Sequence, residues 1–280
     1  MSLSKEVTVI ICTKNAEKTI GETIKSILEN NPSEIIVVDG KSTDSTIEIC
    51  NQYNLKILYD DGIGLGNARN IGLKEVKTEY VYYVGPDCIL KTNSLEPLII
   101  NLKQNNWVGT QPLVSIFEPN NYYLKSINIY RRAKFYPGER SIIGTPWLYK
   151  TSVLKEYMFN ETMNYSDDTE LCARLQRDSL RIGITDIMSY EVGEDNIVDI
   201  FKRWKMYGIS DYDFYKLNYK VWSLSRKIKS FFSPITKDFL VILKSKRINL
   251  FEKFYIFYFL ILIILCRYYG WYFSKIKLKK

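Results

Sequence analysis

Short hydrophobic runs alternate with amphipathic segments along residues 1–90. Runs rich in Val, Ile and Tyr occur at residues 7–12, 35–38, 55–59 and 80–84, and each is short enough to be a buried strand. Between the first two runs, apolar residues from Ile20 to Leu28 recur at the spacing of one helical face. This alternation predicts an α/β fold with a mostly parallel mixed sheet flanked by helices.

The pattern continues less regularly over residues 91–200. It predicts helices at 94–105, 120–135 and 168–176, extended chain at 107–117, a strand and turn at 141–150, and a strand at 182–187. From residue 198 onward the pattern becomes helical, basic and aromatic. We therefore predict one domain over residues 1–200, followed by a helical extension.

Polar and acidic residues follow the predicted strands. Thr13 and Asn15 come after the first strand, Asp39 after the second, Asp60 after the third and Asp87 after the fourth. Ligands of such sheets bind at the carboxyl ends of the strands. A carboxylate there can accept hydrogen bonds from a nucleobase N–H or from sugar hydroxyls. The alternative for Asp39 is a turn residue that caps the next helix.

Acid–base chemistry in this chain must come from residues other than histidine, because the sequence has none. Carboxylates, Lys, Tyr and Cys remain as candidates. The acidic pair Asp167-Asp168 precedes a predicted helix, where acids can have a purely structural role because they complement the helix dipole. The five cysteines show no paired spacing, so we expect neither disulfides nor a zinc site. With no signal peptide visible at the N-terminus, this indicates a reducing, cytosolic catalytic domain.

The glycine-rich stretch GIGLG at residues 62–66 looks like a dinucleotide fingerprint. That motif must follow the first strand and open the first helix. Here it follows the third predicted strand, so the sequence does not favour a dinucleotide-dependent dehydrogenase.

The C-terminal region combines positive charge with a long apolar run. Residues 201–280 hold eighteen Lys/Arg and four Asp/Glu, which indicates a polyanionic partner such as nucleic acid or an anionic membrane. The run 254–266 is apolar throughout and continues through Arg267 to Phe273, so a membrane is the better partner and no nucleic acid is expected. The strict run is shorter than the ~20 residues that usually span a bilayer.

We therefore expect a basic helical region at 201–253, a membrane-associated segment at 254–273 and a basic tail at 274–280. Whether 254–273 spans the membrane or lies on it stays open, and a buried C-terminal helix of a soluble protein is the alternative.

Four stretches together resemble glycosyltransferase family 2, the nucleotide-sugar enzymes with the GT-A fold. They are VTVIICTKN, EIIVVDGKSTDST, GNARNIGLKEVKTEYVYYVGPD, and the segment from GTPWLYK to SDDTELCARL. They occur in the family's order, and the resemblance covers residues 7–210. It implies a GT-A-like (Rossmann-like) domain with a nucleotide-binding half at about 1–90 and an acceptor half at about 91–200.

The resemblance also implies roles for individual residues. The donor-binding residues would be Thr13, Asn15, Asp39, Arg69, Asp87 and Arg203; the acceptor side would include Gly144 and Thr145; Asp168 would be the catalytic base, with Asp167 in reserve. Asp87 matches the second aspartate of the family's D-x-D motif, which binds Mg²⁺ or Mn²⁺, but Gly85 stands where the first aspartate belongs.

The expected activity is inverting transfer of a sugar from a UDP- or GDP-sugar to a glycan or lipid-linked acceptor, at the cytoplasmic face of a membrane. The expected partners are the nucleotide-sugar donor, that acceptor and membrane lipid. Two alternatives stay open. Gly85 prompts a catalytically inactive, membrane-bound nucleotide-sugar-binding protein. A nucleotidyltransferase is the other, although it would need a more basic loop than one with Lys14 alone.

Overall fold

The computed structural model describes residues 2–161 and 166–277, and these divide into two compact units. The sheet unit comprises Met1–Phe117 and Tyr136–Val192, and the helical unit comprises Glu118–Phe135 and Gly193–Lys280. The segment Glu118–Phe135, which the sequence pattern assigned to the acceptor half, thus groups with the C-terminal helices.

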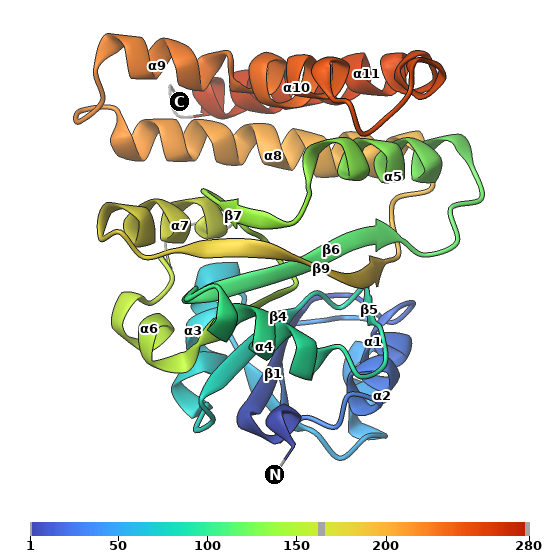
Figure 1. Cartoon of the computed structure of the whole chain (residues 1–280), viewed down its shortest axis with the longest axis vertical. Helices are drawn as coiled ribbons and strands as arrows, with labels where there is room; N and C mark the ends of the chain where they lie inside the picture. Colours follow the sequence, from blue (N-terminus) through green and yellow to red (C-terminus); the bar gives the residue numbers. More distant parts are fainter. Residues whose placement is uncertain (1, 162–165, 278–280) are drawn as a thin grey trace. The chain divides into compact units, whose positions relative to one another are not determined.

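A single sheet forms the centre of the sheet unit (Figure 1). Within the described residues its nine strands are β1 (Val7–Thr13), β2 (Glu34–Asp39), β3 (Lys56–Tyr59), β4 (Tyr80–Val84), β5 (Cys88–Leu90), β6 (Gly109–Ile116), β7 (Gly138–Arg140), β8 (Trp147–Lys150) and β9 (Ile182–Glu191). Their order is β3-β2-β1-β4-β8-β6-β9-β5, and β7 pairs with β9.

Parallel pairing is confined to part of this sheet. Strands β3, β2, β1 and β4 are parallel neighbours, as the alternating pattern of residues 1–90 predicts. Strand β8 then runs antiparallel to both β4 and β6, and β9 pairs antiparallel with β5 and β7. Strands β6 and β9 pair in parallel. The sheet is therefore mixed, and parallel pairing predominates only in the half that ends at β4.

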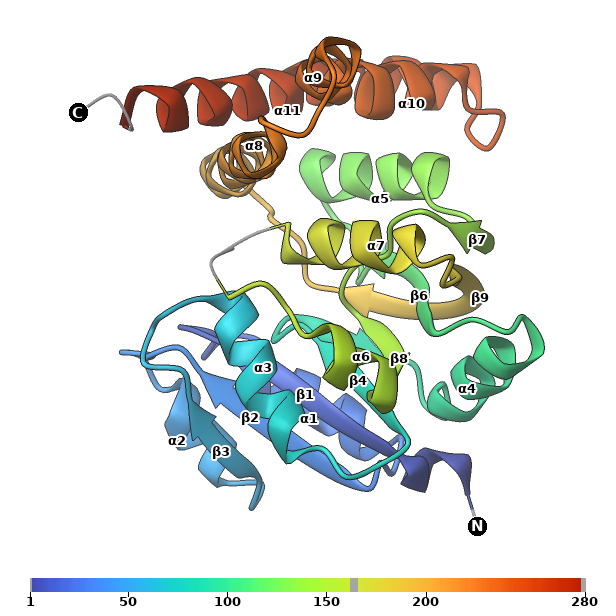
Figure 2. The ribbon, with the colours of Figure 1, turned by 90° about the vertical axis from the view of Figure 1, so that its left-hand side faces the viewer.

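Helices cover both faces of the parallel strands. The helices of the sheet unit are α1 (Ile20–Leu28), α2 (Thr46–Asn51), α3 (Leu65–Glu75), α4 (Leu95–Gln104), α6 (Thr151–Tyr157) and α7 (Asp167–Arg177), after a short 3-10 turn η1 (Leu3–Glu6). Val7, Val9 and Ile11 of β1 join the apolar cluster beneath α1 and α4. Ile10 points to the other face, where α3 lies across β1 and β2 (Figure 2).

The helical unit contains α5 (Tyr122–Lys134), α8 (Ile197–Asn218), α9 (Leu224–Phe231), the π-helical segment η2 (Pro234–Leu240), α10 (Val241–Lys244) and α11 (Leu250–Lys277). Helix α11 packs closely along α8. A Cβ atom at Gly208 would lie 1.9 Å from the carbonyl oxygen of Arg267, and one at Gly270 would lie 2.0 Å from that of Lys205. The two backbones therefore touch at both glycines, and no other residue fits there without a shift.

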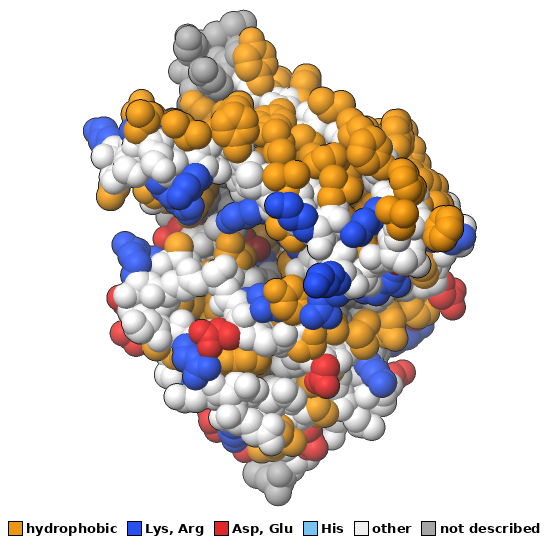
Figure 3. Space-filling view, turned by 45° about the horizontal axis from the view of Figure 1, so that its top comes forward, with side chains coloured by type: hydrophobic (Ala, Val, Ile, Leu, Met, Phe, Trp, Pro, Cys, Tyr) orange, Lys and Arg blue, Asp and Glu red, His pale blue; other side chains and the backbone are white. Residues whose placement is uncertain are grey.

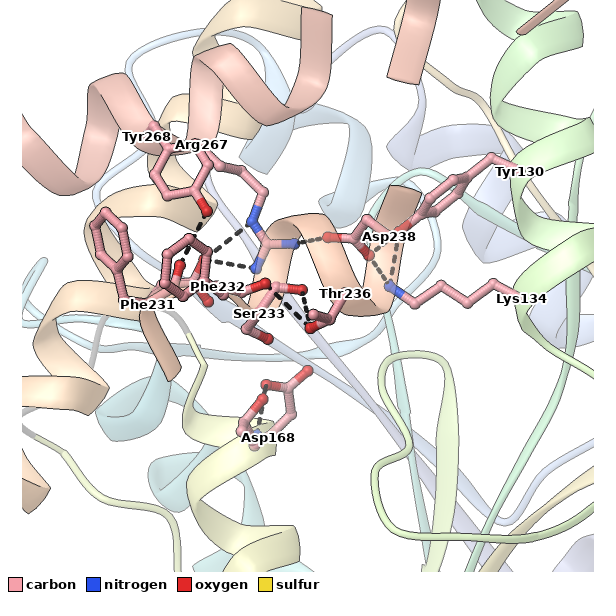
Figure 4. Close-up of polar contacts among 12 residues, drawn as sticks. Tyr130, Lys134, Asp168, Phe231, Phe232, Ser233, Thr236, Asp238, Arg267 and Tyr268 are labelled. Carbon is pink, nitrogen blue, oxygen red and sulfur yellow. Dashed lines mark hydrogen bonds and ion pairs between the residues drawn. The ribbon is translucent and has the colours of Figure 1, made fainter. Parts of the chain in front are cut away.

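The charge inside the apolar run is neutralised within this unit (Figure 4). Arg267 of α11 donates to Asp211 of α8 at 2.5 and 2.9 Å and also pairs with Asp238 of η2. Asp238 in turn accepts from the Tyr130 hydroxyl at 2.6 Å and pairs with Lys134, both on α5. Four elements of the unit are thereby joined by one buried polar network.

Over residues 2–161 and 166–277, we find no helix with the combination of length and hydropathy that crossing a bilayer requires.

Candidate active site

Three of the predicted donor-side residues lie at one edge of the sheet. Thr13 and Asp39 end the neighbouring strands β1 and β2 and stand opposite each other in register. Asp87 follows β4, which pairs with β1 on its other side. The strand ends therefore bring these residues to the carboxyl edge, as parallel topology requires.

The loops after β1 and β2 hold each other. The backbone N–H of Asn15 donates to Ser42 Oγ, and Asn15 Oδ1 accepts from the N–H of Thr43, both at 2.8 Å. Asp39 accepts from the N–H and the hydroxyl of Ser42 and is 1% exposed. Asp39 thus shapes its own turn, and its contact with a nucleotide stays a prediction. Thr13 differs, because its buried hydroxyl has no hydrogen-bond partner among the described residues.

The glycine-rich loop is organised by Asp60. Its carboxylate accepts from the N–H of Gly62 at 2.7 Å and from that of Gly64 at 3.4 Å. The loop folds back on the end of β3 before α3 begins. It therefore connects the third strand to a helix, whereas a dinucleotide fingerprint follows the first strand.

Arg69 of α3 forms a buried ion pair with Asp167, ninety-eight residues away. The same guanidinium donates to Thr145 Oγ1 at 2.9 Å. Its carbon lies 5.0 Å from the Trp147 ring centroid and 5.2 Å from that of Phe159, within cation–π range. Arg69 therefore ties α3 to the start of α7 and to the loop before β8, while its predicted contact with a donor phosphate or ribose stays a prediction.

Asp168 lies next to this pair, half-buried in the first turn of α7. Its Oδ1 accepts from the N–H of Thr169 at 2.6 Å. Burial, and then the charge of Asp167, raise the pKa of Asp168 to about 6, although Arg69 lowers it. A carboxylate with a raised pKa is a stronger base than an ordinary aspartate, and it is still ionised at neutral pH.

The acceptor-side residues lie beside Asp168. A Cβ atom at Gly144 would be only 3.3 Å from Asp168 Oδ2, so glycine leaves room next to the carboxylate. The N–H of Gly144 donates to Gln111 Oε1 at 2.7 Å. Sequence reasoning missed Gln111, because a lone glutamine in a strand carries no signal of the loop it holds.

Asn70 is a second residue that sequence reasoning missed. Its amide exchanges two hydrogen bonds with the backbone of Phe159, each 2.9 Å long. Arg69 and Asn70, the last two letters of GNARN, thus both fasten α3 to the acceptor-side segment.

Asp87 and Arg203 are the two remaining predicted donor-side residues. A Cβ atom at Gly85 would lie 2.7 Å from Asp87 Oδ1, so the Asp87 carboxylate folds over the position of the missing aspartate. The described part of the chain contains no group of three His, Cys, Asp or Glu residues able to hold a metal ion.

Arg203 lies on α8 of the helical unit and pairs with Glu194 at 2.8 Å. Its role at the donor stays a prediction.

Comparison with known proteins supplies the family. Residues 8–158 match the family described as Glycosyl transferase family 2. The chain belongs to this family. The family assignment made from the four sequence stretches is confirmed.

This transferase is similar to larger curated relatives. It is 27% identical over 207 residues to the poly(ribitol-phosphate) beta-N-acetylglucosaminyltransferase TarS of Staphylococcus aureus strain Mu50. The aligned region covers 65% of this chain and 34% of TarS. The chain is 33% identical over 112 residues to TarP of S. aureus strain N315, covering 36% of this chain and 34% of TarP. In each case the match spans about a third of the relative's length.

Solved structures establish the GT-A fold of this transferase. The S. aureus TarS 1–349 structure in complex with UDP matches with a TM-score of 0.54 and 20% identity, over 88% of this chain and 76% of that one. The mannosyltransferase PcManGT from Pyrobaculum calidifontis, in complex with GDP-Man and Mn²⁺, matches with a TM-score of 0.58 and 16% identity, over 93% and 73%.

Proposed function

We propose that this family 2 transferase inverts the anomeric carbon as it moves a sugar from a UDP- or GDP-sugar to a glycan or lipid-linked acceptor. The observation that carries the proposal is the Asp167-Asp168 pair. One carboxylate is bound to the buried Arg69, and its neighbour keeps a pKa raised to about 6 beside the space left by Gly144.

In this mechanism Asp168 accepts the proton of the acceptor hydroxyl as that oxygen attacks the anomeric carbon. The bond from the anomeric carbon to the diphosphate oxygen breaks, and its electron pair leaves with the nucleoside diphosphate. Direct displacement inverts the configuration. Asp168 is assigned as the base because the Asp167 carboxylate is already bound to Arg69, whereas Asp168 lies beside the space left by Gly144.

The proposed donor class draws on the similar structures. One TarS structure contains UDP, another contains UDP-GlcNAc, and the mannosyltransferase structure contains GDP-Man. In this chain the unpartnered hydroxyl of Thr13, at the end of β1, is a group that a bound nucleotide would satisfy.

A divalent cation fits this site if the protein and the donor share its coordination. Asp87 offers one hard carboxylate, and the described residues contain no group of three possible protein ligands. Mg²⁺ or Mn²⁺ bound to a nucleoside diphosphate needs few protein ligands, since phosphate and water oxygens supply the rest. Such a cation would neutralise the departing diphosphate, and two of the similar structures contain Mn²⁺.

We also place the enzyme at the cytoplasmic face of a membrane. The support is the basic composition of residues 201–280 and five cysteines that are all free, as a reducing compartment favours.

Ligand-induced stabilisation tests the donor proposal. The purified chain is heated with UDP-, GDP- and dTDP-sugars, with and without Mn²⁺. A ligand at one hundred times its Kd adds about 2.7 kcal/mol to the free energy of unfolding. We expect a clear rise in Tm for UDP- or GDP-sugars, and no response to any donor would refute the proposal.

A variant pair tests the cation. Asp87→Ala should lose the part of the Tm rise that depends on Mn²⁺, whereas Asp186→Asn, an exposed aspartate of β9, should keep it. If Asp87→Ala responds to Mn²⁺ like the wild type, Asp87 is not a ligand.

A further inference from the structure

Helix α11 has two different apolar faces. One is buried in the helical unit and includes Ile256, Phe259, Leu260 and Ile263, each 0% exposed. The other carries large apolar or aromatic side chains that stay 39–84% exposed in the described part of the chain. Its central line, which we call the apolar stripe, comprises Phe251, Phe254, Tyr258, Ile261, Leu265, Tyr269 and Tyr272.

The apolar stripe is continuous. Its residues follow one another at intervals of three or four, which keeps them on one side of a helix. At 1.5 Å per residue the stripe is about 30 Å long. Phe251 is 84% exposed, Phe254 72% and Leu265 62%. An exposed apolar surface of this length marks an interaction site rather than the scattered apolar residues of an ordinary surface.

Positive charge borders the stripe. Lys244, Lys246 and Arg247 are exposed directly before α11, and Arg226 and Lys229 are exposed on α9. Figure 3 shows hydrophobic side chains gathered over the C-terminal helices, with Lys and Arg side chains along the margin.

Acidic residues are few in the same stretch of the chain. Residues 221–274 contain two acids, Asp238 and Glu252; the first pairs with Lys134 and Arg267, and the second pairs with Arg132.

The opposite side of α11 is committed to protein contacts. Gly270 touches the backbone of α8, and Arg267 is bound to Asp211 and Asp238 (Figure 4). Surrounding this helix with lipid would separate it from α8 and leave Arg267 without its partners. The helix can meet lipid only along the stripe, with its axis parallel to the membrane plane.

We propose that the apolar stripe docks on the surface of an anionic lipid bilayer, with the aromatic side chains at the boundary between headgroups and acyl chains. An apolar face with basic margins is the pattern of in-plane amphipathic helices, and Tyr and Phe suit the interface. A second copy of the chain would bring two basic margins together, and a soluble polyanion would leave the stripe exposed to water. The inference develops the membrane part of the proposed function and is independent of sugar transfer.

Vesicle flotation of the full-length chain tests the proposal. The vesicles are phosphatidylcholine alone, or phosphatidylcholine with phosphatidylglycerol. The wild type should bind the anionic vesicles more tightly. Phe254→Gln combined with Leu265→Gln should lower the partition coefficient at least about tenfold, because two apolar side chains no longer enter the bilayer. Lys246→Glu combined with Arg247→Glu should lower binding to anionic vesicles by about fivefold per charge removed.

A matched control replaces exposed apolar residues on helices of the sheet unit. Leu28→Gln combined with Ile100→Gln should bind vesicles like the wild type. Circular dichroism and donor-induced Tm shifts should be unchanged in all of these variants, since their residues lie outside the candidate active site. A washing step with alkaline carbonate should release the wild type, as expected for a helix that lies on the bilayer.

Four results would overturn the proposal. They are equal binding of the wild type and the stripe variant, absence of binding to anionic vesicles, retention after the carbonate wash, and a wild-type oligomer in solution that the stripe substitutions dissociate. None of these results bears on donor binding, so failure here is distinguishable from failure of the sugar-transfer proposal.

Discussion

Two buried arginines, one in each unit, are neutralised in different ways. In the helical unit, Arg267 and Lys134 face the two carboxylates of Asp211 and Asp238, so cations and anions balance. In the sheet unit, Arg69 pairs with Asp167, and the next residue, Asp168, makes no ion pair among the described residues. The first cluster is complete and holds helices together. The second leaves Asp168 without an ion-pair partner among the described residues, and burial, followed by the charge of Asp167, raises its pKa.

The difference separates a balanced network from the one that holds the proposed base. Asp238 is more deeply buried than Asp168, yet Lys134 and Arg267 hold its pKa below the ordinary value. Burial raises the pKa of Asp211 in the same network, although the ion pair with Arg267 lowers it. A raised pKa therefore supports the proposal for Asp168 only together with its place beside Gly144.

Removing Arg69 should have the largest effect, because it changes both the stability of the sheet unit and the pKa of Asp168. Arg69→Met leaves Asp167 buried without a partner, which costs about 3–5 kcal/mol of unfolding free energy. It also removes the group that lowers the pKa of Asp168, so the midpoint of the pH–rate profile should move upward. Denaturant unfolding and the pH dependence of transfer measure the two effects.

Arg267→Met is the matched control, because it removes an equally paired arginine from the helical unit. It should cost similar stability and leave the pH midpoint unchanged. If Arg69→Met also leaves the midpoint unchanged, Arg69 has only a structural role.

Closer packing at the crossing of α8 and α11 should have an intermediate effect. Gly270→Ala places a Cβ atom against the backbone of Lys205, and overpacking of this kind costs about 1–3 kcal/mol. Gly21→Ala on α1 is the control, since its nearest neighbour would be 3.6 Å away. Thermal unfolding should show a lower Tm for the first and no loss for the second, whereas equal Tm values would contradict the close contact.

Lowering the pH by one unit should have the smallest effect of these changes, and the effect is on the transfer rate. Asp168 must be ionised to accept a proton, and its pKa is about 6. The transfer rate should therefore fall about tenfold per unit below that pH and level off above it. Donor binding at the same pH values separates this effect from loss of substrate. A rate that is flat through this range would exclude Asp168 as the titrating base.

The sequence pattern predicts the parallel half of the sheet well, because its strands are continuous apolar runs between clear turn signals. It misses β5 and β7, because each has only three residues, too few to show the alternation of apolar and polar positions that marks a strand. It also places residues 118–135 with the acceptor half. Their helix was predicted, but which unit it joins depends on distant contacts such as Tyr130 with Asp238.

The candidate site shows the same limit. The residue types and their positions at strand ends are readable from the sequence, and so is the acidic pair. The partner of Arg69 is not, because Asp167 lies far along the chain. Residues 254–266 read as uniformly apolar because α11 buries one apolar face and exposes another, and only the structure separates the two.

The proposed mechanism depends on Asp168 as the base for sugar transfer. The most direct test measures turnover and donor binding on the same samples of wild type, Asp168→Asn and the control Asp186→Asn, with the donor found by thermal shift. We predict that Asp168→Asn loses about 10²–10⁴-fold in kcat while its affinity for the donor stays near that of the wild type. Turnover of Asp168→Asn at the wild-type rate, with donor bound normally, would exclude Asp168 as the base.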